Sequence, residues 1–475
     1  MAKKTGGDLM DKIISLCKRR GFVFPGSEIH GGLANSWDYG PLGVELKNNI
    51  KQLWWNRFVH RRDDMVGIDA ALIMNPKVWE ASGHLKEFAD PLIECRKCHS
   101  RFRMDQLEGI IVGAQEVKKF LEATNTLAAM SVGGVHYAIT DKAICPVCKV
   151  RLRDNYVPPF NFNLMLKTFL GPAEETANLA YFRPETAQAM FVDFKQVLDT
   201  TRRRLPFGIA QVGKVFRNEI TPGNFIFRTR EFEQMEVEYF IAPPKNDTEW
   251  QKHFEHWQNE MRDWLTEIGV DMKKVHEREI SEEDRAFYSK RTVDFEFDYP
   301  FGRKELYGLA YRTDYDLSQH EKFSGASLKY RDPETGEEFV PHVIEPSLGV
   351  DRTILVVLLS AYHEDGERVV LKLNPALAPY QAAVFPLLAN KPELGKLARE
   401  IYNNLRKKYS VAWDDRGNIG KRYYSQDEIG TPFCITVDFD SLKNGDATVR
   451  DRDTAKQERI KINELDNFLH GKIFS

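Results

Sequence analysis

The chain has 475 residues, of which 42% are hydrophobic and 29% are charged, so at ~150 residues per domain we expect roughly three soluble domains rather than one core. No apolar run reaches the ~18 residues of a membrane span, and the first residues lack the apolar centre of a signal peptide, which predicts a cytoplasmic protein with no membrane contact. The formal net charge of −3 excludes a uniformly basic surface, so any contact with nucleic acid must depend on local patches.

The first strong pattern is a helix that begins near Pro41 and runs to about His60. Its apolar residues recur at three- and four-residue spacing, at Leu42, Leu46, Ile50, Leu53 and Trp54. The next run, Val66 to Met74, predicts a strand that Pro76 stops. A long helix followed by a strand that ends in proline is compatible with many folds.

Four of the six cysteines form two pairs with the spacing of a zinc ribbon, at Cys95, Cys98, Cys145 and Cys148. The 46 residues between the pairs exceed the commonest ribbon spacing, so a reduced ribbon without metal is the alternative, and a reducing compartment disfavours disulfides. The enclosed insertion, Glu108 to Ala129, has a mostly helical pattern. The remaining two cysteines, Cys17 and Cys434, are expected to pack in apolar cores.

Further along the chain, Arg183 to Gln188 suits the first turn of a helix, with Pro184 and Glu185 inside it. A Trp- and Met-rich stripe from Trp250 to Ile268 predicts a helix that packs in the core. Strands are then expected over Val293–Tyr311 and Arg312–Asp316.

The strand Val343–Gly349 is expected to lead into an apolar helix, Arg352–Leu359. The segment Leu373–Pro379 predicts a domain boundary. Strands and helices alternate beyond it, which is typical of an α/β domain.

A charged hairpin from Phe216 to Glu236 carries the chemistry. Arg217 and Glu219 share one face of its first arm, and Phe232, Gln234 and Glu236 share one face of its second. The turn formers Thr221, Pro222, Gly223 and Asn224 lie between the arms. Arginine forks suit phosphate and an aromatic ring stacks on a base, so the hairpin is a candidate site for a polyanion. A solvated hairpin whose arginines pair with its own glutamates is the alternative.

The order of these pieces resembles the three signature motifs of class II aminoacyl-tRNA synthetases. The helix and strand ending at Pro76 match motif one, Phe-Arg-Asn-Glu at 216–219 with its loop matches motif two, and Gly349-x-x-Arg352 matches motif three. Within that class the chain resembles the dimeric glycyl-tRNA synthetases, through Trp37-Asp-Tyr-Gly-Pro-Leu-Gly43, Trp79-x-x-Ser82-Gly-His84, Phe102-Arg-x-Asp105, Arg183-Pro-Glu-Thr-Ala-Gln188, Glu305-Leu306, Arg312-Thr-Asp-Tyr-Asp-Leu317 and Glu345-Pro-Ser347.

The resemblance implies an α+β fold, in which helices flank an antiparallel sheet. It also implies a small insertion like a zinc ribbon and a C-terminal α/β anticodon-binding domain. The expected segments are the motif-one part of the catalytic domain (1–94), the cysteine insertion (95–150), the motif-two core (151–240), a helical insertion (241–290), the motif-three core (291–375) and the anticodon-binding domain (380–475).

The implied reaction is the activation of glycine by ATP with Mg²⁺, followed by transfer of glycine to tRNA(Gly), in a homodimer. Arg217, Glu219 and Arg352 are the expected catalytic residues. Arg217 would hold the α-phosphate, Arg228 and Arg352 the other phosphates, and Phe232 would stack on adenine opposite Arg352. The full expected ATP-binding set is Arg217, Asn218, Glu219, Phe227, Arg228, Thr229, Arg230, Glu231, Phe232, Glu305, Leu306, Gly349, Val350, Asp351 and Arg352.

Glycine has no side chain, so its ammonium and carboxylate groups must be recognised. The resemblance implies that Glu185, Glu236 and Glu345 surround the ammonium group, and that Arg103 or Arg312 complements the carboxylate end. The full expected glycine-binding set is Arg103, Glu185, Phe232, Glu233, Gln234, Met235, Glu236, Arg312, Glu345, Pro346, Ser347, Leu348 and Gly349. His84 is expected to have a structural role or to position the tRNA end.

Two other functions remain open at this point. A synthetase for another small amino acid, such as serine or proline, is disfavoured by the three glutamates. A catalytically inactive relative that binds nucleic acid or a partner is disfavoured because Arg217, Arg228 and Arg352 are all present.

Overall fold

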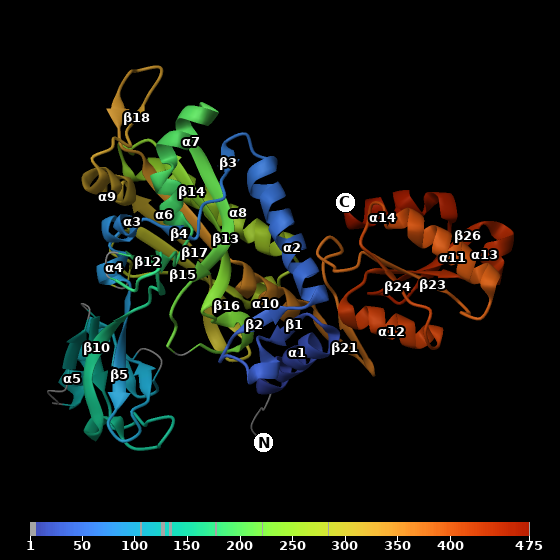
Figure 1. Cartoon of the computed structure of the whole chain (residues 1–475), viewed down its shortest axis with the longest axis horizontal. Coiled ribbons are helices and arrows are strands. Elements are labelled where there is room, and N and C mark those ends of the chain that lie inside the picture. The colour runs from blue at the N-terminus through green and yellow to red at the C-terminus, as the bar shows by residue number, and fades with distance from the viewer. Residues whose placement is uncertain are drawn as a thin grey trace.

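A seven-stranded sheet runs through the centre of the molecule (Figure 1). The strand order is β15-β16-β17-β20-β14-β13-β3, and neighbours are antiparallel except for the parallel pair β13 and β3. The strands are β3 Met65–Gly67, β13 Phe207–Phe216, β14 Glu231–Ile241, β15 Val275–Glu279, β16 Arg291–Tyr299, β17 Gly302–Thr313 and β20 His342–Gly349.

The structure is a computed structural model that describes residues 6–104, 107–124, 129–132, 135–175, 178–220, 222–283 and 285–474. Asp105 and Thr221, which the sequence patterns include, lie outside the described residues. No helix of the described part is both long and apolar enough to cross a membrane.

The two faces of the central sheet differ in character. One face packs on a large apolar core with helices α2 Pro41–Trp55, α8 Asp247–Glu267 and α10 Val350–Ala361. Because strand residues alternate, Met235 and Leu348 point into this core, whereas Gln234 and Ser347 line cavities on the other face. Helix α6, Ala187–Val192, covers part of that second face and contacts α9, Tyr315–Ser324. The site therefore lies on the polar side of a sheet that a buried core supports from behind.

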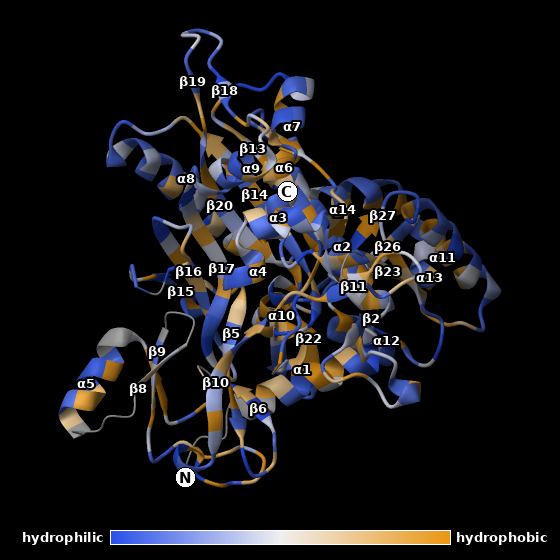
Figure 2. Cartoon of the chain, turned by 60° about the vertical axis from the view of Figure 1, so that its left-hand side comes forward, coloured by the Kyte–Doolittle hydropathy of each residue, from blue (hydrophilic) through white to orange (hydrophobic). Residues whose placement is uncertain are grey.

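A module that contains the four paired cysteines, residues 89–163, projects from the central part of the molecule at the lower left of Figure 1. We call it the cysteine module. Its first sheet contains β5 Ala89–Cys95, β6 Arg101–Arg103 and β10 Tyr156–Asn163. Its second sheet contains β7 Ile110–Val112, β8 Ala129–Val132 and β9 Val135–Ile139. Figure 2 shows helix α5, Ala114–Thr124, at the outer end of the module. The insertion predicted to be mostly helical thus has one helix between short strands.

The C-terminal part forms a five-stranded sheet with its own apolar core, at the right of Figure 1. Strand β23 is parallel to β24 and β25, and the remaining pairs are antiparallel. The elements are β23 Ala382–Pro386, α11 Pro392–Leu405, β24 Val411–Trp413, α12 Ile419–Ile429, β25 Phe433–Val437, α13 Phe439–Asn444, β26 Asp446–Asp451, β27 Gln457–Lys461 and α14 Leu465–Ile473. The predicted fold class, α+β with a C-terminal α/β part, is confirmed, and the buried positions of Cys17 and Cys434 are as predicted.

The predicted strand Val66–Met74 is wrong, because only its two ends are strands. Residues 65–67 pair with β13, and β4, Ile73–Met74, pairs with β12, Leu179–Phe182, in another sheet. Between them the Ala70 and Leu72 carbonyls accept hydrogen bonds from the side chain and the backbone of Arg183. A buried arginine thus satisfies carbonyls that a neighbouring strand would otherwise satisfy.

Two further boundaries also differ from the prediction. Pro184 and Glu185 precede α6, which begins at Ala187, and the backbone N–H of Thr186 at its start donates to Glu236 (3.0 Å). Asp316 lies in the first turn of α9 rather than in a strand.

Candidate active site

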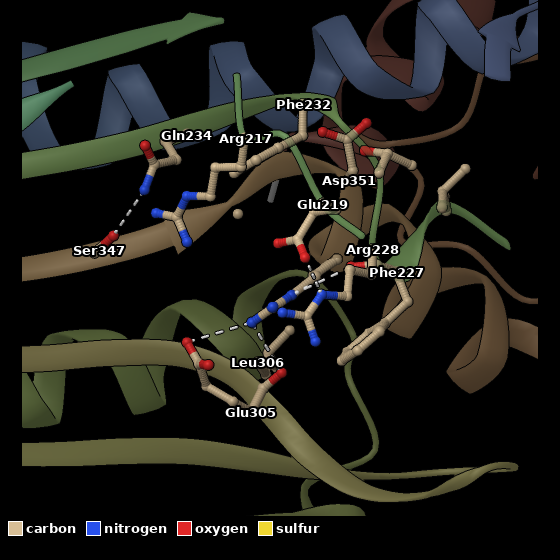
Figure 3. Close-up of a pocket in the computed structure, with 14 residues that line it drawn as sticks. Arg217, Glu219, Phe227, Arg228, Phe232, Gln234, Glu305, Leu306, Ser347 and Asp351 are labelled. Carbon is tan, nitrogen blue, oxygen red and sulfur yellow. Dashed lines mark hydrogen bonds and ion pairs between the residues drawn. The ribbon is translucent and has the colours of Figure 1, made fainter. Parts of the chain in front are cut away.

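Two cavities meet on the polar face of the central sheet. The first, drawn in Figure 3, is lined by Arg217, Glu219, Ile226, Phe227, Arg228, Thr229, Phe232, Gln234, Glu305, Leu306, Ser347, Gly349, Asp351 and Arg352. The second is lined mainly by carboxyl, hydroxyl and guanidinium groups, including those of Glu185, Glu236, Glu345, Tyr288, Thr292, Asp294, Arg278 and Arg285. Arg217, Gln234, Glu305 and Ser347 line both cavities. A molecule in the first cavity therefore lies next to a molecule in the second.

Arg217 stands where the two cavities join. Its guanidinium lies 5.3 Å from the ring centre of Phe232 and 5.4 Å from that of Phe88, and its Nε donates to the Pro184 carbonyl (3.1 Å). The first arm of the hairpin, β13, ends at Phe216, so Arg217 and Glu219 belong to the connecting segment and not to the strand. The prediction that they share a strand face is wrong, yet both side chains reach the first cavity.

Glu219 organises the opposite wall of the first cavity. Its carboxylate accepts a hydrogen bond from Arg228 (2.8 Å) and lies 4.0 Å from Arg103. Arg103 comes from β6 of the cysteine module and pairs with Asp90. Arg103 lines neither cavity, so its predicted contact with glycine stays a prediction.

Arg352 and Glu305 form the third wall, and Glu305 is labelled in the lower part of Figure 3. Their charged groups are 3.3 Å apart, and the guanidinium lies 4.7 Å from the ring centre of Phe227. The positive charge of Arg352 lowers the pKa of Glu305, against the effect of burial. The predicted sandwich of adenine between Arg352 and Phe232 stays a prediction, since Arg352 stacks on Phe227 here.

The second cavity contains a cluster of three glutamates from three elements. Glu185 precedes α6, Glu236 is on β14 and Glu345 is on β20. The strand register places Glu236 beside Ser347, whose hydroxyl donates to it (2.5 Å), and Gln234 donates to the same oxygen (2.8 Å). The other Glu236 oxygen accepts from the Thr186 backbone and hydroxyl. Each carboxyl group is thus oriented by neutral donors or, as below, by a cation.

Arg312 orients Glu345 from behind. One nitrogen donates to both Glu345 oxygens (3.0 Å each), and the others bind Asp316 (2.7 and 2.8 Å). The Tyr288 ring centre lies 3.8 Å from the Arg312 guanidinium, on the cavity side. Arg312 is 1% exposed and does not line the cavity, so its predicted contact with the glycine carboxylate stays a prediction.

The three glutamates differ in their pKa values. Burial acts to raise the pKa of Glu185, but the charge and hydrogen bond of His84, with Arg312, hold that pKa well below its ordinary value. Burial raises the pKa of Glu236, and the negative charge of Glu185 adds to the effect. Burial is the main cause that raises the pKa of Glu345 to about 8; the charge of Arg312 opposes it, and the charges of Glu236 and Glu185 add to it. Glu185 is therefore the member of the three whose pKa is lowered, so it is ionised at neutral pH.

Several predicted residues do not line either cavity, and strand alternation explains three of them. Glu233, Met235 and Leu348 alternate with site residues and point away, with Glu233 paired to Lys47 (2.8 Å) and Lys51 (3.0 Å). The others outside both linings are Asn218, Arg230, Glu231, Val350 and Pro346, together with Arg103 and Arg312. The predicted contacts of these residues with ATP or glycine stay predictions.

The structure also adds residues that the patterns missed. Tyr288, Thr292 and Asp294 line the second cavity from the start of β16 and the segment before it. Thr292 and Asp294 alternate with the buried Val293 and Phe295, and this period-two pattern was an available signal. Tyr288 had no such signal in the sequence, since it lies outside the helices and strands.

Glu238 is a fourth acid beneath the glutamate cluster. It is fully buried, neither carboxyl oxygen has a hydrogen-bond partner, and burial together with the charge of Glu345 raises its pKa well above the ordinary value. The folded protein therefore holds a proton that the unfolded chain releases. Between the pKa of Glu238 in the unfolded chain and its pKa in the folded protein, the free energy of unfolding falls as pH rises, by about 1.4 kcal/mol per pH unit.

We expect Glu238→Gln to remove that pH-dependent loss, because glutamine keeps the shape and has no proton to release. The melting temperature of the variant, relative to the unchanged protein, should rise between about pH 5.5 and pH 8. Thermal unfolding of both proteins at both pH values is the measurement. Parallel melting curves across this range would mean that Glu238 is ionised in the folded state.

The four paired cysteines come together in the cysteine module. Their sulfur atoms all lie within 4.8 Å of one another, with 3.5 Å between Cys95 and Cys148 and 3.6 Å between Cys98 and Cys145. Four thiolates bound tetrahedrally to Zn²⁺ at about 2.3 Å lie roughly 3.8 Å apart. The donor set and the spacing therefore fit a structural zinc ion.

Comparisons with known proteins agree with this geometry. Residues 172–361 match the family model described as tRNA synthetase class II core domain (G, H, P, S and T), and residues 381–472 match that of the anticodon binding domain. A glycine–tRNA ligase of Caldanaerobacter subterraneus subsp. tengcongensis is 50% identical over 98% of both chains. That of Lachnospira eligens is 51% identical over 98% of both chains, and that of Geobacillus thermodenitrificans is 50% identical over 98% of this chain and 97% of its own.

Proposed function

The chain belongs to the glycine–tRNA ligases, which are class II synthetases with an anticodon-binding domain, and on this premise we propose how its two cavities divide the work. ATP occupies the first cavity and glycine the second. A glycine carboxylate oxygen attacks the α-phosphorus, the bond to the β-phosphate breaks, and pyrophosphate leaves. The terminal ribose of tRNA(Gly) then takes the glycyl group and releases AMP.

The arginines supply the chemistry of the first step. Charge develops around the α-phosphorus during the displacement, so positioned cations stabilise the transition state more than a base or nucleophile would. Arg217 lines both cavities and is placed to contact the α-phosphate and the glycine carboxylate together. Arg228 and Arg352 serve the remaining phosphates, with Mg²⁺ that ATP itself carries. The junction of the two cavities at Arg217 is the observation that carries the proposal.

The glutamates supply the recognition of glycine. An ammonium group donates hydrogen bonds and carries positive charge, so the ionised Glu185 is its main partner, with Glu236 and Glu345 around it. The three glutamates of the second cavity disfavour serine and proline as substrates. The gathering of three arginines in one cavity likewise argues against an inactive relative.

The test is amino-acid-dependent exchange of pyrophosphate into ATP, run with each standard amino acid in turn. We expect exchange with glycine and only background exchange with alanine, serine and proline. A second assay, transfer of labelled glycine to tRNA(Gly), then tests the tRNA step. Exchange that is equal for alanine and glycine would contradict the assignment of the second cavity.

The cysteine module is proposed to hold a structural zinc ion through Cys95, Cys98, Cys145 and Cys148. Zinc would join the two turns that bear the cysteine pairs into one closed unit. We expect elemental analysis to find about one zinc per chain, and Cys148→Ser to lose it and lower the melting temperature. Cys434→Ser, which alters a buried cysteine elsewhere, is the matched control and should keep the metal. A stable protein with no zinc would identify a ribbon that needs no metal.

We also propose that the active form is a homodimer, as the resemblance to the dimeric enzymes implies. Light scattering at working concentration measures this directly, and a monomeric mass at full activity would contradict it.

A further inference from the structure

His84 lies outside both cavities, yet it contacts Glu185, the acid of the second cavity whose pKa is lowered. Its Nε2 lies 3.2 Å from a Glu185 carboxylate oxygen, and its Nδ1 lies 2.8 Å from the Ser82 hydroxyl. The side chain is 7% exposed and lines neither the first cavity nor the second. Any effect of His84 on a molecule in the second cavity must therefore pass through Glu185.

We propose that His84 is a positioning residue for glycine binding, which holds one oxygen of Glu185 so that the carboxylate presents a fixed face to the ammonium group. Ser82 contributes by binding the other ring nitrogen. The inference rests on the proposed function, in which Glu185 binds that ammonium group. It replaces the earlier expectation that His84 is merely structural or positions the tRNA end.

The histidine ring is itself held firmly. It packs against Trp79, with 5.6 Å between ring centres, and against Phe88 at 5.3 Å. The Asn163 amide donates to the His84 carbonyl (3.0 Å), which anchors the start of helix α4, His84–Glu87. The Nε2 side of the ring faces Glu185, and the Nδ1 side faces the Ser82 hydroxyl, which itself donates to the Trp79 carbonyl (3.4 Å). Rotation of the ring would break both contacts at once.

The second Glu185 oxygen is held from another direction. The Gln188 amide donates to it (3.0 Å) and also to Asp316 (2.9 Å), and its own oxygen accepts from His320 (2.9 Å). Both Glu185 oxygens are thus held by polar contacts with residues that do not line the second cavity. Loss of the His84 contact leaves only the Gln188 bond, so the carboxylate gains freedom to turn about its terminal torsion.

The low pKa of Glu185 supports the same assignment. Burial alone raises the pKa of a carboxyl group, and His84 is the largest influence that opposes burial at Glu185. Without His84 the buried carboxylate would be less ionised as well as less ordered, and both changes weaken the attraction for an ammonium group.

Two amide substitutions separate this role from simple packing. His84→Gln places an N–H group where Nε2 lies, within reach of Glu185, whereas His84→Asn places its amide near Nδ1 and Ser82. We expect His84→Asn to raise the KM for glycine roughly 10- to 100-fold, as the loss of one hydrogen bond to a charged group does, with the KM for ATP unchanged. His84→Gln should recover most of that loss. His253→Gln, at a half-buried histidine beside Tyr239, is the control and should change neither constant.

A double-mutant cycle with Glu185→Gln completes the test. If His84 acts through Glu185, His84→Asn should add little to a protein that already carries Glu185→Gln. Additive effects, equal losses in His84→Gln and His84→Asn, or parallel changes in the KM for ATP and for glycine would overturn the inference. Failure of the proposed function looks different, because Glu185→Gln alone would then leave the KM for glycine unchanged. Variants that fail to fold are recognised by their melting temperatures. If His84→Asn fails to fold, His84→Gln can still be compared with the unchanged protein.

Discussion

Replacing Arg217 by alanine is expected to slow glycine-dependent pyrophosphate exchange by about 10²- to 10³-fold. Arg217 is one of four residues that line both cavities, and it is the arginine among them. In the proposed function it contacts the nucleotide and the amino acid at the position where charge develops. Its removal should therefore lower kcat more than it raises the KM for either substrate.

Two companion variants sharpen this prediction. Arg217→Lys keeps a positive charge and loses the planar fork, so it should recover only part of the rate. Arg291→Ala removes an arginine of the same sheet that pairs with Glu279 and stacks on Phe254 away from the cavities, and it should leave exchange unchanged. An unaltered kcat in Arg217→Ala would remove Arg217 from the transition state.

Glu185→Gln is expected to cost about 2–5 kcal/mol in glycine binding, which corresponds to a rise of roughly 30- to 4,000-fold in the KM for glycine. Glutamine keeps the size of the side chain and loses the charge, and Glu185 is the pocket acid whose pKa lies well below its ordinary value. ATP binding should survive, because Glu185 lines only the second cavity. Initial rates of exchange at varied glycine and ATP concentrations measure both constants.

The control for this variant is Glu260→Gln, which neutralises a glutamate of α8 that pairs with Arg57 (2.8 Å) outside the site. It should leave both constants unchanged. Equal losses of glycine and ATP binding in Glu185→Gln would instead indicate that Glu185 supports the fold around both cavities. Loss of glycine binding alone distinguishes a ligand of the ammonium group from a structural acid.

Much of the fold was predicted from local patterns in the sequence. The apolar spacing from Leu42 to Trp54 and from Trp250 to Ile268 predicted helices α2 and α8, because a helix buries one face at that period. The strand before Gly349 and the apolar helix after it were also predicted. The run from Val66 to Met74 failed, because its centre is occupied with hydrogen bonds to Arg183, more than a hundred residues away.

Part of the candidate site followed from pattern as well. The alternation of Gln234 and Glu236 on β14, and of Glu345 and Ser347 on β20, places these four polar side chains on one face, and all four line the second cavity. The same alternation points Glu233 and Met235, which the prediction includes, to the opposite face of the sheet, so their predicted contacts with glycine stay predictions.

The sequence by itself determined which side of each strand is polar, which arginines are present and which cysteines are paired, because these are properties of neighbours along the chain. Only the tertiary structure decided that Arg312 stands behind Glu345, that Arg103 reaches Glu219, and that His84 holds Glu185. Such contacts depend on which elements pack together, and no local spacing encodes them. The charge state of each buried acid depends on the same packing, because burial and the nearest cation together set its pKa.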